Sequence, residues 1–281
     1  MLSYRHAFHA GNHADVLKHS VLMLVLDYIT QKDKPFLYVD THSGAGMYDL
    51  HNGWADKNRE YETGIGRIWQ QPSQNWPEGM QTYLRAIRDL NSDGDLREYP
   101  GSPWLAQFML REQDKARLFE LHRNEYQNLN ALFSRYKQIH TEERDGFQAL
   151  SAVLPPVERR AVILIDPSYE VKADYQNVVQ AVKTAHKKFA TGVYLIWYPV
   201  VNRKWATKLE RDFTDSGMRN ILLAELAIRA DAEEAGMTAS GMIVINPPWQ
   251  LADSLKVVLP FLQKELAEEG GGFRLEQLVA E

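Results

Sequence analysis

The residues of this chain with the clearest chemical potential follow an apolar run. Residues 161–165 read Ala-Val-Ile-Leu-Ile, and the next four are Asp166, Pro167, Ser168 and Tyr169. A continuous, β-branched run is typical of a buried strand in a parallel sheet. In open α/β sheets, ligands bind beyond the carboxyl ends of the strands. A carboxylate, a rigid turn and an aromatic ring at that place could therefore hold a planar base with hydrogen-bonding edges.

These residue types suit the transfer of a methyl group to the exocyclic amine of adenine. The lone pair of that amine is delocalised into the ring, and acceptors for its two N–H groups favour the nucleophilic form. Asp166 would supply one acceptor, and the carbonyl of Pro167, held by the fixed φ of proline, would supply the other. Tyr169 would stack on the base. The competing interpretation is an ordinary proline turn with Tyr169 buried in the core.

A second stretch fits the same pattern more literally. Residues 246–249 read Asn-Pro-Pro-Trp and also follow an apolar run. Few residues follow Trp249, too few for the strands expected after a central catalytic strand. We therefore interpret this stretch as the exit from the last strand, where the proline pair ends strand pairing.

Three other predicted strands end in an acid that could contact a cofactor. Asp40 precedes a glycine turn at 44–46 that lacks the third glycine of a dinucleotide fingerprint. An acid there disfavours a pyrophosphate, so a cofactor with a cationic centre, such as S-adenosylmethionine, fits better. Glu120 could accept hydrogen bonds from ribose hydroxyls, and Asp145 with the backbone of Gly146 could receive a cofactor adenine. Each acid could instead be a solvated strand end.

The first residues of the chain are rich in histidine and basic groups. Lys18 and His19 lie on a predicted helix and could pair with the carboxylate of the cofactor. A polar, half-solvated start is the competing interpretation. Without cysteine or a paired carboxylate motif, no metal site is expected. The residues that could contact a phosphate and a base of RNA are Tyr4, Arg5 and His6.

The elements that must position these residues follow from hydrophobic periodicity. Seven strands that mostly alternate with helices are typical of a doubly wound α/β sheet. Residues 47–99 are polar and uneven, so we predict an inserted helical subdomain there, within a main domain of residues 1–46 and 100–281. Helix caps are predicted at Asn12, at Ser102 and at Asn124. The strands are predicted at 36–39, 117–121, 139–144, 161–165, 192–197, 221–228 and 242–245.

Composition narrows the classes of function. The 281 residues include no cysteine, which excludes disulfides and suits a reducing cytoplasm. No signal-peptide pattern opens the chain, and its apolar runs are far short of the roughly 20 residues that cross a bilayer, so no membrane association is expected. The net charge is −5, whereas proteins that bind long nucleic acids nonspecifically are usually basic. A nucleic-acid substrate must therefore meet a local basic surface, and a monomer is expected because no apolar stripe is left over.

Several short motifs, spread over nearly the whole chain, are distinctive as a set. Together they closely resemble the bacterial 23S ribosomal RNA adenine-N6 methyltransferases of the RlmJ type. The motifs are Met-Leu-Ser-Tyr-Arg-His at 1–6, Gly-Asn-His-Ala-Asp-Val-Leu-Lys-His at 11–19, Asp-Thr-His at 40–42 with Gly-Ala-Gly at 44–46, Tyr-Pro-Gly-Ser-Pro at 99–103, Asp-Gly-Phe at 145–147, Leu-Ile-Asp-Pro at 164–167, and residues 238–249.

The resemblance implies a class I S-adenosylmethionine-dependent fold, Rossmann-like, with a seven-stranded, mostly parallel sheet and a small helical insertion. It implies one methyl group on one adenine of 23S ribosomal RNA, added to protein-free RNA or to an early assembly intermediate in the cytoplasm. Asp166 would be the catalytic position, and Tyr4 would contact the RNA. His42 and Ser102 enter the site only through the resemblance. The cofactor-binding residues that it implies are His19, His42, Ser102, Glu120, Asp145 and Gly146.

The chain departs from the family at one position, and two other functions remain as alternatives. The family pattern is Asp-Pro-Pro-Tyr, and Ser168 stands at its third position. Because a backbone carbonyl can come from any residue type, activity is expected to survive with a slightly looser turn. A DNA adenine-N6 methyltransferase would use the same loop, but no target-recognition domain of obvious size is present. A non-catalytic nucleic-acid-binding protein, used to consume external DNA, is disfavoured by the acidic net charge.

Overall fold

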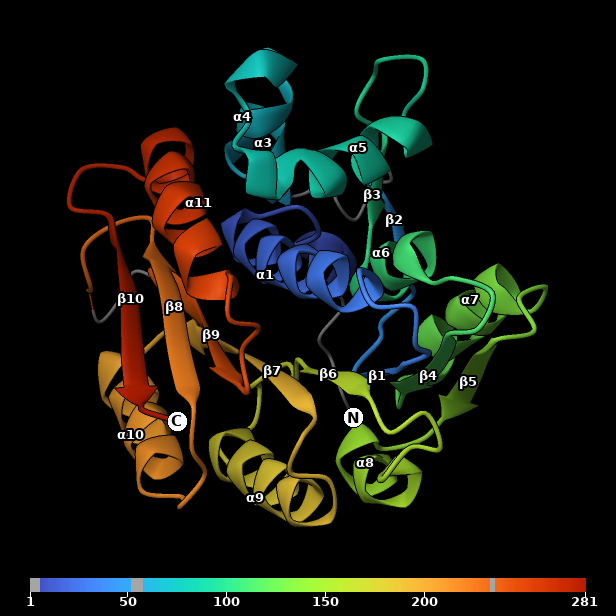
Figure 1. Ribbon diagram of the computed structural model, residues 1–281. Helices are drawn as coiled ribbons and strands as arrows, with labels where there is room; N and C mark the ends of the chain where they lie inside the picture. Colours follow the sequence, from blue (N-terminus) through green and yellow to red (C-terminus); the bar gives the residue numbers. More distant parts are fainter. Residues whose placement is uncertain (1–5, 52–57, 233–235) are drawn as a thin grey trace.

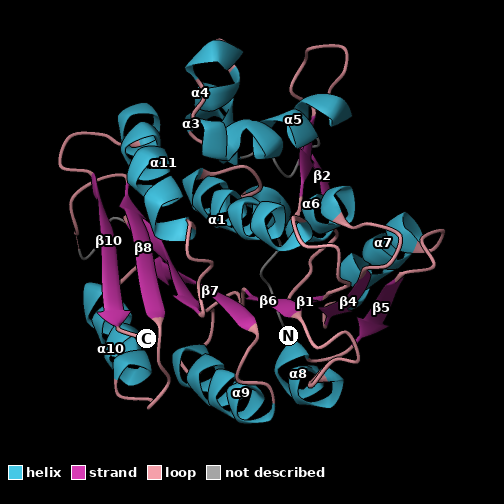
Figure 2. Cartoon of the chain, viewed as in Figure 1, coloured by secondary structure: helices cyan, strands magenta, loops and turns pink. Residues whose placement is uncertain are grey.

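The fold is built around one eight-stranded sheet with helices on both faces (Figures 1 and 2). The computed structural model describes residues 6–51, 58–232 and 236–281. None of the helices in these ranges has the length and hydropathy that a membrane span requires. The strands of the sheet are β1 (Leu37–Asp40), β4 (Lys115–Glu120), β5 (Ile139–Glu143), β6 (Ala161–Ile165), β7 (Val193–Val200), β8 (Ile221–Ala227), β9 (Ala239–Ile245) and β10 (Gly272–Val279).

The order of the strands is that of the predicted fold class. It runs β10-β8-β9-β7-β6-β1-β4-β5, with β5, β4, β1, β6 and β7 mutually parallel. β9 lies between β7 and β8 and is antiparallel to both. This is the doubly wound sheet of class I methyltransferases, but it has eight strands and the prediction of seven is wrong. β10 was missed because it is a half-exposed edge strand in which polar residues interrupt the apolar ones, and it pairs with β8 alone.

Helices cover the two faces because side chains alternate along the strands. In β1, Tyr38 belongs to the core beneath α1 (His13–Thr30), whereas Leu37 and Val39 belong to the core on the other face. Figure 1 shows α1 and α11 above the sheet, and α8, α9 and α10 below it. Besides α1, the helices that pack on the sheet are α6 (Ser102–Met109), α7 (Arg123–Phe133), α8 (Gly146–Val153), α9 (Asp174–Lys188), α10 (Arg203–Thr214) and α11 (Leu251–Leu266).

The segment between β1 and α6 extends above α1 (Figure 1). Its predicted helix is confirmed as α5 (Gln81–Leu90), and the strands β2 (Met47–Asp49) and β3 (Glu98–Pro100) pair antiparallel beside it. We propose to treat residues 47–99 as an insertion in the main domain of 1–46 and 100–281, because they interrupt the connection from β1 to β4. Their apolar residues join the same core as α1. The shorter helices of the segment are α3 (Glu60–Thr63), α4 (Ile65–Trp69), η2 (Ser73–Asn75) and η3 (Glu78–Met80).

Of the three predicted helix caps, one is confirmed and two are wrong. The side chain of Asn12 accepts hydrogen bonds from two backbone N–H groups in the first turn of α1, each at 3.0 Å. The cap of α6 is Gly101, because Ser102 is already helical and donates its hydroxyl to Asp40 at 2.7 Å. The helix α7 begins before Asn124. The side chain of Glu120 accepts a hydrogen bond at 2.7 Å from the backbone N–H of His122, and this contact turns the chain directly after β4.

The Asn-Pro-Pro-Trp stretch at 246–249 lies at the opposite edge of the sheet from Asp166. It follows β9, whose last residue, Ile245, pairs with Tyr194 near the start of β7. Asp166 follows β6, which runs parallel to β7. The stretch is therefore the exit from β9, as predicted, but β9 is not the last strand because β10 follows it.

Candidate active site

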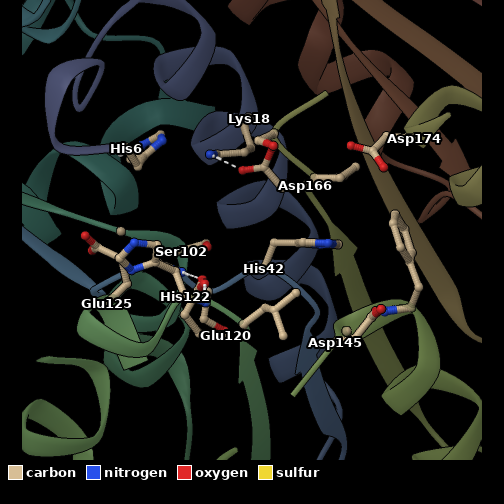
Figure 3. Close-up of a pocket in the computed structure, with 18 of the residues that line it drawn as sticks. His6, Lys18, His42, Ser102, Glu120, His122, Glu125, Asp145, Asp166 and Asp174 are labelled. Atoms are coloured by element: carbon tan, nitrogen blue, oxygen red, sulfur yellow. Dashed lines mark hydrogen bonds and ion pairs between the residues drawn. The ribbon is translucent and has the colours of Figure 1, made fainter. Parts of the chain in front are cut away.

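A cavity of about 240 Å³ opens where the carboxyl ends of β1, β4, β5 and β6 meet. It brings together residues that are far apart in the sequence, as expected at this edge of a parallel sheet. In the view of Figure 3, Lys18 and Asp166 face each other at one side, Glu120 and Asp145 lie at the other, and His42 lies between. The predicted site residues that line this cavity are His6, Lys18, His19, His42, Ser102, Glu120, Asp145, Gly146, Asp166 and Pro167.

Among the described residues, one predicted site residue does not line this cavity. Tyr169 lines a neighbouring cavity instead. Tyr4 and Arg5 lie outside the described residues, so their proposed contact with RNA has no structural counterpart here. Within the described ranges, no cluster of three or more histidine, aspartate or glutamate side chains could hold a metal ion.

A row of alternating charges ends at Asp166. Lys18 Nζ lies 2.5 Å from Asp166 Oδ2 and 2.8 Å from Asp15 Oδ1. Asp15 Oδ2 lies 2.8 Å from His6 Nε2. Burial alone would lower the pKa of Lys18, but the two carboxylates outweigh it and raise that pKa. Lys18 therefore stays charged. It compensates Asp166 and also lines the cavity, and its role as a partner for the cofactor carboxylate stays a prediction.

Two hydrogen-bond acceptors remain at the end of β6. Asp166 uses Oδ2 for Lys18, and Oδ1 accepts no hydrogen bond from the described part of the chain. The carbonyl of Pro167 likewise accepts none from those residues. Tyr169 has a positive φ of 54°, which is uncommon for a bulky residue and is typical of a constrained functional loop. The loop thus presents a carboxylate oxygen and a carbonyl oxygen side by side in sequence.

The neighbouring cavity, also of about 240 Å³, is lined by aromatic rings. Tyr169 donates its hydroxyl to the carbonyl of Trp197 at 2.7 Å, and its ring centroid lies 4.6 Å from that of Tyr175. Tyr175 in turn contacts Trp205, with centroids 5.9 Å apart. Asp166 lines this cavity as well as the first one, so its carboxylate stands between the two. Rings of this kind bind bases by stacking.

Asp40 is a buried hydrogen-bond acceptor below the first cavity. Its side chain is fully buried, and Oδ2 accepts hydrogen bonds from Tyr38 at 2.8 Å and from Ser102 at 2.7 Å. Burial raises the pKa of Asp40 to about 6, although both hydroxyls oppose the rise. Ser102 therefore holds the start of α6 against the end of β1, which explains why a serine is found at this position.

Glu120 and Asp145 shape the far side of the cavity. Glu120 accepts hydrogen bonds from the backbone N–H groups of Gly44 at 2.8 Å and His122 at 2.7 Å, and burial raises its pKa. Asp145 is the cap of α8 and accepts from the first-turn N–H groups. At Gly146, a Cβ would lie 1.9 Å from the carbonyl oxygen of Thr41, so only glycine allows this close approach.

Two histidines of the first cavity are neutral. Burial lowers the pKa of His42 to about 4, and its Nδ1 lies 2.8 Å from the hydroxyl of Thr41. Burial likewise lowers the pKa of His19 to about 3. His19 Nε2 is buried and has no partner among the described residues, so it is free to bond a ligand. This set of groups fits S-adenosylmethionine. It offers carboxylates for a ribose and an amine, neutral histidines, and a glycine that allows close approach to the backbone.

Sequence reasoning missed several residues of the site. Asp15 went unnoticed, although it lies three positions before Lys18 in the same helix, a spacing that brings side chains together. Trp197 ends a predicted strand, and nothing in the spacing of Trp197 or Trp205 distinguishes a cavity wall from a core position. Their role depends on β7 and α10 meeting beside the loop that follows β6.

Comparison with known proteins gives one family. Residues 33–279 match the family described as "Ribosomal RNA large subunit methyltransferase D, RlmJ". The chain is 51% identical over 272 residues to "Ribosomal RNA large subunit methyltransferase J" of Escherichia coli (strain K12), covering 97% of this chain and 96% of the relative. It is 50% identical over 273 residues to the protein of the same name from Haemophilus influenzae, with the same two coverages.

Solved structures agree with the fold. Protein LPL1258 from Legionella pneumophila is 39% identical and superposes with a TM-score of 0.90, covering 96% of this chain and 98% of its own. A probable spermidine synthase from Corynebacterium glutamicum superposes with a TM-score of 0.51 at 9% identity, covering 92% of this chain and 74% of its own. The second similarity concerns the fold alone.

Proposed function

The chain belongs to the RlmJ family of ribosomal RNA large subunit methyltransferases, and we propose that it transfers a methyl group from S-adenosylmethionine to N6 of one adenine in 23S ribosomal RNA. One observation supports an exocyclic amine as the acceptor of the methyl group. Asp166, with one oxygen free of partners in the described structure, stands between a cavity that fits the cofactor and a cavity lined by aromatic rings.

The first cavity would hold the cofactor. S-adenosylmethionine supplies an electrophilic methyl group on its sulfonium. Glu120 would accept from the ribose hydroxyls, because each carboxylate oxygen keeps a lone pair beyond its backbone hydrogen bond. Asp145 and the backbone of Gly146 would receive the adenine of the cofactor, and His19 Nε2 would meet its carboxylate. His42 and Ser102 complete the wall between these groups.

The second cavity would hold the target adenine. A base must leave its stack to reach this cavity, a step that costs a few kcal/mol. Stacking on Tyr169, Tyr175 and Trp205 would offset that cost, since each stacked base contributes about 1–3 kcal/mol. The N6 amine would then point at the loop that follows β6. Tyr4, Arg5 and His6 would contact the RNA strand around the flipped base.

Asp166 and Pro167 would activate the amine. The carboxylate oxygen and the carbonyl each accept one N–H of N6, which concentrates the lone pair on the nitrogen. In the transfer, the bond between the methyl carbon and the sulfonium sulfur would break as the bond to N6 forms, and Asp166 would receive the proton that the positively charged N6 releases. Lys18 holds the carboxylate in this direction through Oδ2 and leaves Oδ1 for the substrate.

The same geometry supports an accessible form of the RNA as the substrate. The target base has to enter a cavity beside a buried ion pair, so the RNA around it must be accessible. We propose protein-free 23S ribosomal RNA or an early assembly intermediate as the substrate, acted on in the cytoplasm by a monomer. Light scattering of the protein in solution tests the monomer directly.

The deciding experiment offers isotopically labelled S-adenosylmethionine with three substrates: protein-free 23S ribosomal RNA, mature large subunits and genomic DNA. Digestion to nucleosides then identifies the labelled product. Labelled N6-methyladenosine from free RNA, and little from mature subunits, is the expected result. Label in DNA would replace the proposal with a DNA adenine methyltransferase. No label in any substrate would favour a non-catalytic nucleic-acid-binding protein.

A further inference from the structure

A row of three side chains runs from the inserted segment to the wall of the first cavity. The hydroxyl of Tyr83, in α5, lies 2.7 Å from the hydroxyl of Tyr99, in β3. The hydroxyl of Tyr99 lies 2.8 Å from Nδ1 of His19, in α1. The exposed fractions of the three residues are 0%, 0% and 1%. Neither tyrosine lines the cavity, whereas His19 does.

The three groups are all neutral, so their hydrogens can be counted. Burial lowers the pKa of His19 to about 3, and burial raises the pKa values of Tyr83 and Tyr99 above that of a free phenol. Each hydroxyl then has one hydrogen to donate, and the imidazole carries one N–H.

When a carboxylate accepts a hydrogen bond at Nε2 of His19, only one direction of donation gives every hydrogen of the three side chains an acceptor. If His19 carried its hydrogen on Nδ1, it would donate to Tyr99, and Tyr99 would donate to Tyr83. The hydroxyl hydrogen of Tyr83 would then be buried with no acceptor among the described residues, which is costly. In the opposite direction, Tyr83 donates to Tyr99 and Tyr99 donates to Nδ1. The hydrogen of the imidazole is then on Nε2, the nitrogen that has no partner within the described ranges.

We propose that Tyr83 and Tyr99 are positioning residues that fix His19 as the Nε2–H tautomer, so that the inserted segment sets the donor for the carboxylate of S-adenosylmethionine. The proposal rests on the proposed role of His19 in cofactor binding. The other tautomer would present a lone pair at Nε2 and would repel a carboxylate. The insertion thus acts on cofactor binding through a hydrogen-bond relay, without contacting the cavity.

The test replaces each hydroxyl without changing the ring. Tyr99→Phe removes the hydroxyl that donates to Nδ1 of His19. Tyr83→Phe removes the hydroxyl that orients the hydroxyl of Tyr99. Titration calorimetry with S-adenosylmethionine measures affinity, and long-range ¹H–¹⁵N spectra of histidine-labelled protein identify the tautomer. The signals of His19 are assigned from the spectrum of His19→Gln. Tyr194→Phe is the matched control, because it removes another buried hydroxyl, which bonds to the carbonyl of Phe189 in the opposite core.

In the native protein saturated with S-adenosylmethionine we expect His19 as the Nε2–H tautomer. In Tyr99→Phe we expect mixed tautomers and an affinity for S-adenosylmethionine about tenfold weaker. Tyr83→Phe should move both quantities in the same direction by less, and the control should move neither. The turnover at saturating cofactor and the KM for RNA should stay unchanged, which a general loss of structure would not allow.

Two results would overturn the relay. One is the Nδ1–H tautomer for His19 in the native protein saturated with S-adenosylmethionine, which needs no variant and is informative even if Tyr99→Phe fails to fold. The other is native affinity and native tautomer in both Tyr99→Phe and Tyr83→Phe. Failure of the proposed function looks different, because the native protein itself would then show no binding of S-adenosylmethionine.

Discussion

Lys18 Nζ lies 2.5 Å from Asp166 Oδ2, although 148 positions separate the two residues in the chain. The first is on α1, which packs across the sheet, and the second follows β6. Lys18 also contacts Asp15, so the carboxylate at the candidate catalytic position belongs to a buried row of charges. The orientation of Asp166 is therefore set by the first helix of the chain as well as by its own strand.

Replacing Asp166 with alanine should abolish methyl transfer and leave cofactor binding nearly intact. The variant removes the acceptor for N6, a group of a kind that contributes about 10²–10⁴-fold to rate. Lys18 keeps Asp15 as a partner, so no buried charge is left alone. Single-turnover transfer to protein-free 23S ribosomal RNA measures the loss, and calorimetry with S-adenosylmethionine is the control. Transfer at the native rate in the variant would show that Asp166 is not the acceptor.

Replacing Ser168 with proline restores the family pattern, and we expect at most a few-fold change in turnover. The carbonyl that accepts from N6 belongs to Pro167, which is already present. A following proline favours extended backbone at Pro167 and reduces the freedom of the unfolded chain, which stabilises by about 0.4–1 kcal/mol where the native conformation fits. Steady-state rates and thermal unfolding give the two quantities. A many-fold gain in turnover would mean that the native loop is substantially impaired.

Much of the sheet could be predicted because its signals are local. Buried parallel strands such as β6 are continuous apolar runs, and they reveal themselves without knowledge of their neighbours. β10 carries no such run, because an edge strand has one paired side and both faces partly exposed. Whether its alternating polar residues form a strand depends on the free edge of β8, which lies about fifty residues earlier in the chain.

The site was predicted in part for the same reason. Acids at strand ends can be located from the strands, so Glu120 and Asp145 were found before any partner was known. The partner of Lys18 could not be found in this way, since nothing near Lys18 in the sequence identifies Asp166. Of the aromatic cavity only Tyr169 was predicted. Trp205 was missed, because it has the spacing of a core residue on its helix and becomes a cavity wall only through Tyr175.

Replacing Trp205 with alanine should weaken RNA binding without affecting the cofactor. Loss of one stacking contact of about 1–3 kcal/mol raises the KM for RNA by about fivefold to a hundredfold. Trp249→Ala is the matched control, because Trp249 is 72% exposed at the opposite edge of the sheet. Rates at varied RNA concentration, with saturating S-adenosylmethionine, measure the change. Equal KM values for RNA in the two variants would show that the base does not bind in this cavity.

Asp40 should make the native protein lose stability as pH rises from about 4 to 6. Its carboxyl has an ordinary pKa of 3.8, and burial raises the pKa to about 6 in the folded protein. Below pH 3.8 it is protonated in both states. Between the two values only the unfolded state ionises, so the free energy of unfolding falls by about 3 kcal/mol, at roughly 1.4 kcal/mol per pH unit.

Asp40→Asn isolates this contribution, because the asparagine does not titrate. The free energy of unfolding is measured by urea titration at pH 4 and pH 7 for both proteins. We expect the native protein to lose about 2.4 kcal/mol relative to the variant between these values. Parallel pH dependence in the two proteins would show that the carboxyl is not protonated preferentially in the folded state.

Replacing Gly146 with alanine should reduce both stability and cofactor affinity. A Cβ at this position would lie 1.9 Å from the carbonyl oxygen of Thr41, and backbone atoms cannot move aside as a flexible side chain can. The helix α8 would have to shift away from the end of β1, and Asp145, its cap, would shift with it. Overpacking of this kind costs about 1–3 kcal/mol. Gly272→Ala is the control, since a Cβ there meets nothing within 4 Å. Thermal unfolding measures the loss of stability, and calorimetry with S-adenosylmethionine measures the loss of affinity. A variant that loses stability but binds the cofactor normally would show that Asp145 does not contact the cofactor.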